Sequence, residues 1–283
     1  MTSKRNPVNL DRALITGASG MLGSYVDFGI RTTRETLDLS ECVAVVERVA
    51  TYAPSAIIHL AAETNVDASE EHPESAFAIN SAGTYYLALA ARKLAIPMVY
   101  ISTGGIFDGL KKGPYTPEDV PNPQNVYSHS KYLGELAVSG LLSDYLIVRT
   151  GWLFGGGPAR DRKFVGNIYA QLEHPVIKAV EDQHGSPTYA KDVVEAIRSL
   201  LSEGKRGIVN VVNAGVASRY DMAKEIVAIT GSKATVTPVS LASFTFSATR
   251  VRNESLAVGS VVLRPWQEAL RDYLTREWQG NGH

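Results

Sequence analysis

Short, almost continuous apolar runs alternate with longer segments of helical periodicity over the first half of the chain. The runs cover 13–16, 29–33, 56–60, 98–102 and 145–149, and the helical patterns between them lie around 42–52, 75–94 and 127–142. Strands that are apolar throughout and separated by helices indicate a parallel sheet covered on both faces. The pattern therefore predicts an α/β fold with a Rossmann-type, doubly wound parallel sheet.

The alternation is looser after Thr150. The pattern predicts strands at 176–180 and 208–212, a turn at 182–188, and helices at 190–201, 218–230 and 264–277. In the last helix Trp266, Leu270 and Leu274 recur at i, i+4 and i+8, which predicts that they face a core. We expect a dinucleotide-binding domain over 1–150 and a smaller C-terminal substrate-binding lobe over 151–283, with segments near 176–212 returning to the first domain and extending its sheet.

The composition of the 283 residues is typical of a soluble globular protein, with 45% hydrophobic residues, 20% charged residues and a formal net charge of -1. No charge run indicates a nucleic-acid partner, and no apolar run approaches the ~18 residues of a membrane helix. Because residues 1–10 are polar, we expect no secretory signal and a cytoplasmic location. The single cysteine, Cys42, excludes an internal disulfide and a cysteine metal site, and we expect it to be a packing residue of a helix. The histidines show no spacing typical of a metal site.

A glycine-rich segment follows the first predicted strand. Gly17, Gly20 and Gly23 lie where that strand passes into a helical stretch. Glycines at such a junction let the backbone approach a pyrophosphate at the positive end of a helix. The spacing differs from the commoner GxGxxG, and three glycines also occur in ordinary loops, but the preceding buried strand favours a dinucleotide site.

Tyr127 and Lys131 lie four residues apart in a predicted helix for which Asn125 is the N-cap. They therefore share one helix face, where an ammonium near the phenol favours the phenolate and lowers its pKa. Such a pair is by itself usually an ordinary surface pair. Thr103 ends the fourth strand, where its hydroxyl can hold a substrate carbonyl or simply cap local backbone. Together with the glycine segment, these residues predict proton transfer beside a dinucleotide.

In this combination and order, the motifs resemble those of the extended short-chain dehydrogenase/reductases, and most closely the dTDP-4-dehydrorhamnose reductase branch. The resemblance covers nearly the whole chain. The matching segments are 38–40, 59–67, 79–80, 101–109, 125–131, 149–155, 182–188 and 250–256.

The resemblance implies roles for individual positions. Tyr127 would donate the proton to the sugar C4 oxygen, Lys131 would lower the tyrosine pKa and bind the nicotinamide ribose, and Thr103 would hydrogen-bond the reacting oxygen. Asn80 matches a helix asparagine that helps to align the lysine in the wider superfamily. The implied cofactor-binding residues are Gly17, Ser19, Gly20, Met21, Leu22, Asp38, Leu39, Leu60, Ala61, Ala62, Thr64, Tyr127 and Lys131. The implied substrate-binding residues are Val66, Thr103, Gly104, Trp152 and Arg250; Trp152 would stack on the sugar nucleotide or serve as an ordinary core residue.

Two positions depart from the branch. Gly104 stands where an aspartate usually contacts the sugar, and Val251 follows Arg250 where proline is usual. Both departures concern the identity of the sugar and leave the reductase chemistry intact.

Cofactor choice depends on the residues at the end of the second strand. An acidic residue there would hold a ribose 2′-hydroxyl, whereas basic residues accept a 2′-phosphate. The chain has Arg31 and Arg34 at this place. We therefore predict that both bind the cofactor and that NADPH is favoured over NADH, the alternative being that both arginines are only solvated.

The resulting hypothesis is an NAD(P)H-dependent reductase of a nucleotide-linked 4-keto-6-deoxy sugar, with no metal and with a possible homodimer. The same apparatus serves sugar-nucleotide epimerases and dehydratases, and a non-catalytic regulatory subunit is a further alternative. In the loop 155–162 and just after it, Arg160, Arg162 and Lys163 can meet a diphosphate or be ordinary surface charge.

Overall fold

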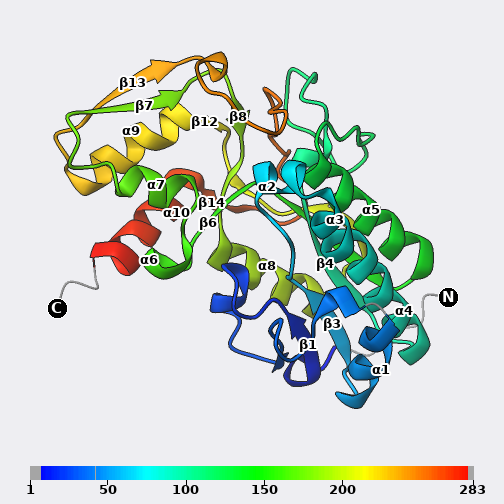
Figure 1. Cartoon of the computed structure of the whole chain (residues 1–283). Coiled ribbons are helices and arrows are strands. Elements are labelled where there is room, and N and C mark those ends of the chain that lie inside the picture. Colours follow the sequence, from blue (N-terminus) through cyan, green and yellow to red (C-terminus); the bar gives the residue numbers. More distant parts are fainter. Residues whose placement is uncertain (1–7, 42, 280–283) are drawn as a thin grey trace.

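The computed structural model describes residues 8–41 and 43–279. Its centre is a sheet of six parallel strands: β1 (Ala13–Thr16), β2 (Ile30–Arg31), β3 (Ala56–His59), β4 (Met98–Thr103), β5 (Tyr145–Thr150) and β10 (Gly207–Asn210). Their order across the sheet is β10-β5-β4-β3-β1-β2, and Figure 1 labels β4, β3 and β1. Every residue of β1 and β3 is buried, as expected for strands covered on both faces.

Helices cover the two faces of this sheet. On one face lie α1 (Val43–Thr51), α4 (Thr84–Leu94) and α5 (Val126–Leu141); on the other lie α8 (Ala190–Ser202) and the short 3-10 helix η2 (Leu22–Tyr25) (Figure 1). Alternate residues of β1 enter the two cores, Leu14 the first and Ala13 and Ile15 the second. The prediction of a doubly wound sheet is confirmed.

The connections reverse direction next to β1. The chain goes from β1 to β2 on one side and then crosses to β3 on the other, from where it continues through β4 to β5. Sheets of this kind bind ligands outside the carboxyl ends of the strands at such a reversal. The fold therefore places its crevice beyond Thr16 and His59.

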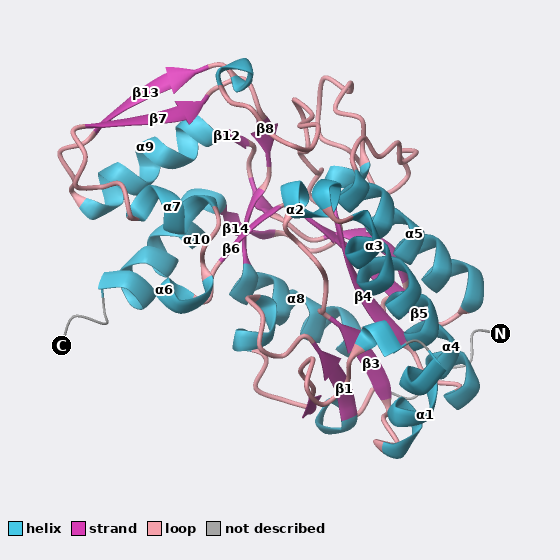
Figure 2. Cartoon of the chain, in the orientation of Figure 1, coloured by secondary structure: helices cyan, strands magenta, loops and turns pink. Residues whose placement is uncertain are grey.

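The chain beyond β5 builds most of a smaller lobe around a core of its own. Here β7 (Val176–Val180) pairs with β13 (Thr235–Val239), and α7 (Phe164–Tyr169), α9 (Arg219–Thr230) and α10 (Trp266–Tyr273) pack nearby (Figure 2). Trp266, Leu270 and Leu274 are all buried in this core, as their spacing predicted. The lobe and its junction also contain β6 (Trp152–Phe154), α6 (Gly157–Arg160), β8 (His184–Gly185), β9 (Pro187–Tyr189), β11 (Asn213–Ala214), β12 (Ala217–Ser218), β14 (Leu263–Pro265) and the π-helix η7 (Leu274–Gln279).

Several local predictions were wrong. The strand at 176–180 does not extend the central sheet, because it pairs with β13 in the smaller lobe; its mostly alternating exposed and buried residues are those of a strand with one covered face. Segment 182–188 is not a plain turn, since it contributes to β8 and β9. The helix predicted over 75–94 is divided into α3 (Pro73–Ala76), a π-helical turn η4 (Phe77–Gly83) and α4. Cys42 lies outside the described residues.

The remaining short elements lie in connections: η1 (Leu10–Arg12), η3 (Leu39–Glu41), α2 (Val66–Glu71), η5 (Gly104–Ile106) and η6 (Leu241–Ser243). No helix in the described part of the chain is both long and apolar enough to cross a membrane.

Candidate active site

A groove of about 370 Å³ lies beyond the carboxyl ends of β1 and β3. Most of the predicted cofactor-binding residues line it: Gly17, Ser19, Gly20, Met21, Leu22, Arg34, Asp38, Leu39, Leu60, Ala61, Ala62 and Thr64. It is also lined by residues outside that prediction, namely Thr16, Thr33, Leu37, Ile79, Leu153, Arg160 and Lys163. Segments that are far apart in the sequence thus form one binding surface.

The glycine segment forms a tight turn beside the end of β3. Gly17 has φ +71°, and a Cβ there would come within 2.5 Å of the Ala61 nitrogen. A Cβ on Gly23 would come equally close to the Gly17 carbonyl oxygen. Only glycine fits these two positions, and the bare backbone that results suits the close approach of a dinucleotide pyrophosphate.

The two arginines predicted to select the cofactor lie in different environments. Arg31 donates to the carbonyl oxygens of Val26, Ala18 and Gly23 at 2.7, 3.1 and 3.2 Å, so its guanidinium holds the glycine turn and does not line the groove. Arg34 does line the groove; its side chain is 80% exposed and its Nε lies 3.4 Å from a carboxylate oxygen of Asp38. Of the two, Arg34 is the cation that can reach a 2′-phosphate.

Thr103 and Tyr127 meet beyond the end of β4. Helix α5 begins at Val126, where the Asn125 side chain accepts a hydrogen bond from the Ser128 nitrogen at 2.9 Å, as its N-cap role predicts. Burial raises the pKa of the Tyr127 phenol to about 12, although its hydrogen bond with Thr103 lowers that pKa. The prediction that this pKa is lowered is therefore wrong, because burial raises it. A phenol that keeps its proton at neutral pH is suited to donate it.

Lys131 lies one turn further along α5 and is only 3% exposed. Burial lowers its pKa to about 7, while the nearby carboxylate of Glu135 raises it. Its Nζ lies 4.2 Å from the centre of the Tyr100 ring, and the Tyr100 hydroxyl donates to the Lys131 carbonyl oxygen at 3.0 Å. The lysine is thus held on the sheet side of the helix.

Asn80 connects this helix to the groove. Its amide nitrogen donates to the Glu63 carbonyl oxygen at 3.0 Å and to the Ser130 hydroxyl at 2.9 Å, and its amide oxygen accepts from the Glu63 nitrogen at 2.9 Å. Asn80 is fully buried within the π-helical turn, a feature that is frequent at functional sites. Asn80 thus ties Ser130, the neighbour of Lys131, to Glu63, which lies between the groove residues Ala62 and Thr64.

Two of the predicted substrate-side residues, Val66 and Gly104, lie on elements that contact α5, the helix of Tyr127. Val66 begins α2, and Gly104 follows Thr103, where a Cβ would come within 2.6 Å of the Glu254 carbonyl oxygen. The guanidinium of Arg250 donates to the Asp67 carboxylate at 2.6 Å and is therefore already paired.

Trp152 is only 8% exposed and has three close neighbours. Its Nε1 donates to the Glu254 carboxylate at 2.9 Å, a Cβ on Gly185 would come within 2.3 Å of the indole, and the Arg219 Cζ lies 3.5 Å from the ring centre. Little of the indole is left for stacking on a sugar. Sequence reasoning missed Arg219 and Glu254 as residues of this region; the only signal was that Glu254 lies inside the segment 250–256.

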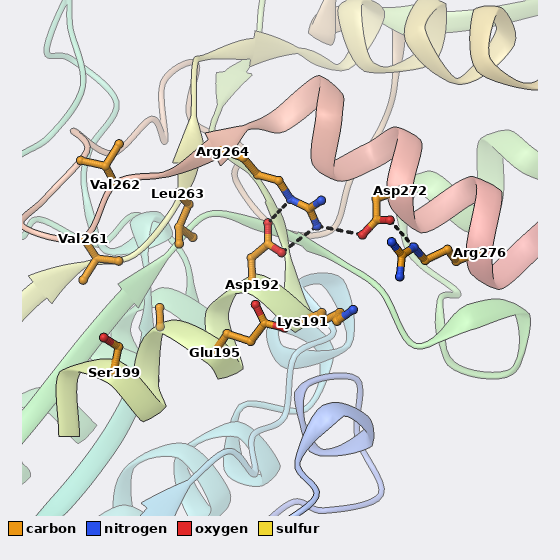
Figure 3. A pocket seen from close by; sticks show the side chains of 11 residues that line it. Lys191, Asp192, Glu195, Ser199, Val261, Val262, Leu263, Arg264, Asp272 and Arg276 are labelled. Atoms are coloured by element: carbon orange, nitrogen blue, oxygen red, sulfur yellow. Dashed lines mark hydrogen bonds and ion pairs between the residues drawn. The ribbon is translucent and has the colours of Figure 1, made fainter. Parts of the chain in front are cut away.

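A second hollow, of about 540 Å³, lies between α8, the segment 261–264 and α10 (Figure 3). Its charges are joined to one another: Arg264 binds Asp192 at 2.8 Å and Asp272 at 3.0 Å, and Asp272 also pairs with Arg276. These contacts link the covering helix of the sheet to the closing helix of the lobe, so the hollow belongs to the junction between them. Among the described residues, no group of three or more His, Cys, Asp or Glu side chains is placed to hold a metal ion.

Comparison with known proteins places the whole site in context. Residues 11–278 match the family model described as the RmlD substrate binding domain. The chain is 35% identical to a dTDP-4-dehydrorhamnose reductase of Mycobacterium tuberculosis, over 92% of this chain and 91% of the relative. It is 36% identical to a dTDP-4-keto-6-deoxy-D-glucose reductase of Streptomyces niveus, over 76% and 77%. The crystal structure of a dTDP-4-dehydrorhamnose reductase from Bacillus anthracis in complex with NADP superposes with a TM-score of 0.88 at 32% identity, covering 94% of this chain and 99% of that chain.

Proposed function

This chain belongs to the family of the RmlD substrate binding domain, and we propose that it is an NAD(P)H-dependent reductase of a nucleotide-linked 4-keto-6-deoxy sugar, of the dTDP-4-dehydrorhamnose reductase type. The observation that carries this proposal is the meeting of Thr103 and Tyr127, with Lys131 one helical turn away, on a helix that Asn80 links to Glu63, the neighbour of the groove residues Ala62 and Thr64. The side chains of Thr103, Tyr127 and Lys131 do not themselves line the groove. Relatives named as reductases of two dTDP-linked keto sugars support the substrate class.

The groove fits a nicotinamide dinucleotide. The turn at Gly17 and Gly23 would hold the pyrophosphate, and Arg34 would meet the adenosine ribose. When bound, the cofactor supplies the hydride for C4 of the sugar. We propose NADPH as the preferred donor because Arg34 is the charged side chain placed for a 2′-phosphate.

The protein's own residues supply proton transfer and positioning. The Tyr127 phenol, protonated at neutral pH, donates its proton to the C4 oxygen as negative charge develops there. The Thr103 hydroxyl contacts the phenol and can hydrogen-bond the same oxygen. Lys131 would bind the nicotinamide ribose, and Asn80, through its hydrogen bonds to Ser130 and Glu63, holds helix α5 against the segment that borders the groove.

The proposal also assigns the two ligands to different parts of the chain. Residues 1–150 bind the dinucleotide and 151–283 mostly bind the substrate, with Val66, Gly104, Trp152 and Arg250 around the sugar nucleotide. The enzyme acts in the cytoplasm and assembles as a homodimer. Cell fractionation and light scattering of the purified protein test these last two points.

The deciding experiment follows the absorbance of the reduced nicotinamide. The purified chain is mixed with NADPH or NADH and with dTDP-4-dehydro-6-deoxy-L-hexose, and then with dTDP-4-keto-6-deoxy-D-glucose. Stoichiometric oxidation with one sugar establishes the reductase and its cofactor. Conversion of sugar without net oxidation would indicate an epimerase or dehydratase, and cofactor binding without any conversion would indicate a regulatory subunit.

A further inference from the structure

Arg219, the first residue of α9, has an environment unlike that of the other partly buried arginines. Its guanidinium lies 3.5 Å from the centre of a Trp152 ring and 4.8 Å from that of Phe164. Within residues 8–41 and 43–279 it forms no hydrogen bond or ion pair. Arg149, Arg250 and Arg264 also lie over aromatic rings, but each donates to a carboxylate.

An unpaired cation in this position is energetically unfavourable until an anion joins it. Burial lowers the pKa of Arg219 to about 10, while the Glu254 carboxylate raises it without coming within ion-pair distance. Removing a guanidinium from water without hydrogen-bond acceptors is costly, so such groups normally have an anionic partner. The stacking on Trp152 holds the guanidinium plane in place, and its edge donors remain available to a planar or tetrahedral oxyanion.

The surrounding charges show which part of a substrate would lie here. The Glu254 carboxylate interacts electrostatically with both Tyr127 and Arg219, and it accepts a hydrogen bond from the Trp152 indole on which Arg219 lies. Lys163 interacts electrostatically with Arg219 and also lines the cofactor groove. One carboxylate is thus within electrostatic reach of both the proposed proton donor and the unpaired cation.

This set of groups matches the chemistry of a sugar nucleotide. In a six-membered sugar ring, C1 with its diphosphate lies across the ring from C4. When the C4 oxygen is at Tyr127, the ring hydroxyls pass the Glu254 carboxylate and the diphosphate reaches the cations beyond it. We propose that Arg219, stacked on Trp152 and assisted by Lys163, binds the diphosphate of the sugar nucleotide, and that Glu254 accepts a hydrogen bond from a hydroxyl of the sugar ring. This assignment rests on the proposed function for the nature of the substrate.

The test measures binding of dTDP by calorimetry, in the presence of NADPH, to the wild type, Arg219→Met and Arg219→Gln. Methionine still covers the indole but carries no charge. Arg198→Met is the matched control, because Arg198 also lies over an aromatic ring, Phe28, and pairs with the exposed Asp27 away from the groove. We expect the dTDP Kd to rise at least tenfold in both Arg219 variants and to stay within twofold in the control, with an unchanged NADPH Kd.

Kinetics separate binding from a merely structural role. A diphosphate held equally in the ground state and the transition state affects KM, so Arg219→Met is expected to raise the KM of the sugar nucleotide at least tenfold while kcat changes less. Arg219→Lys, which keeps a cation, is expected to retain more affinity than Arg219→Met. Wild-type-like dTDP binding by a folded Arg219→Met or Arg219→Gln would overturn the assignment, as would failure of the wild type to bind dTDP, UDP and GDP.

The binding measurement needs no turnover, which separates this proposal from the proposed function. A wild type that binds dTDP through Arg219 but reduces neither keto sugar would refute the function and leave the diphosphate site in place. A functioning reductase whose Arg219 variants bind dTDP normally would refute the site alone.

Discussion

Glu135 forms a buried ion pair that supports both the fold and Lys131. Its two carboxylate oxygens accept from Arg149 at 2.9 and 2.8 Å, and the two side chains are 3% and 2% exposed. Arg149 also donates to the Pro117 carbonyl oxygen at 3.0 Å. Since Glu135 lies one turn after Lys131 on α5, its charge also raises the lysine pKa.

Replacement of Glu135 by alanine leaves the Arg149 guanidinium buried with the Pro117 carbonyl as its one hydrogen-bond acceptor among the described residues. Removing one member of a buried, doubly hydrogen-bonded pair destabilises a protein by about 3–5 kcal/mol, because the remaining charge is desolvated without compensation. In a chain of this size that corresponds to a fall in Tm on the order of 10 °C. We expect Glu135→Ala to show a loss of this size.

Differential scanning calorimetry at neutral pH measures the effect. The control is Asp27→Ala, which breaks the exposed pair with Arg198, where about 1 kcal/mol or less is expected. The double variant Glu135→Leu with Arg149→Met should recover much of the loss, since it removes both charges together. A Glu135→Ala protein as stable as the Asp27→Ala control would refute the assignment of a large uncompensated charge to Arg149.

Three further outcomes are expected. Tyr127→Phe should lower kcat by about 10²–10⁴-fold with an unchanged NADPH Kd, because only the donated proton is lost; near-normal turnover in steady-state assays would contradict its role. Arg34→Ala should weaken NADPH on the order of tenfold and leave NADH nearly unaffected, as titration of each cofactor will show; equal effects on both would exclude a 2′-phosphate contact. The folded-state pKa of Lys131, about 7, lies below its ordinary value of 10.5, so from about pH 7 to pH 10 the unfolded chain holds a proton that the folded chain has lost. The Tm of the cofactor-free protein should therefore gain a rising contribution with pH in this range, and Lys131→Met should abolish that contribution.

The local parts of the site were predictable from the sequence. The glycine turn follows a buried strand, and Asn125 begins the helix that carries Tyr127 and Lys131; each is set by neighbours within a few residues. Parallel strands place their carboxyl ends at one edge of a sheet. For this reason the pattern also predicted that the groove residues would converge.

Other features depend on contacts between distant segments. Arg31 has the same sequence environment as a cofactor-binding arginine, yet the carbonyl oxygens of the turn bind its guanidinium. The strand at 176–180 belongs to the lobe because it pairs with 235–239, a segment far along the chain. The residues that neighbour Arg31 and the strand 176–180 in the sequence do not determine either of these contacts.

The sequence by itself determined the doubly wound sheet, the glycine turn at the groove and the helix that carries Tyr127 and Lys131, because periodicity, glycine spacing and helix capping act over short distances. Only the tertiary structure decided the electrostatics of the site. Burial, which depends on the whole fold, keeps the Tyr127 phenol protonated and lowers the Lys131 pKa to about 7. The stacking of Arg219 on Trp152 and the hydrogen bond from that indole to Glu254 likewise arise where three separate segments meet.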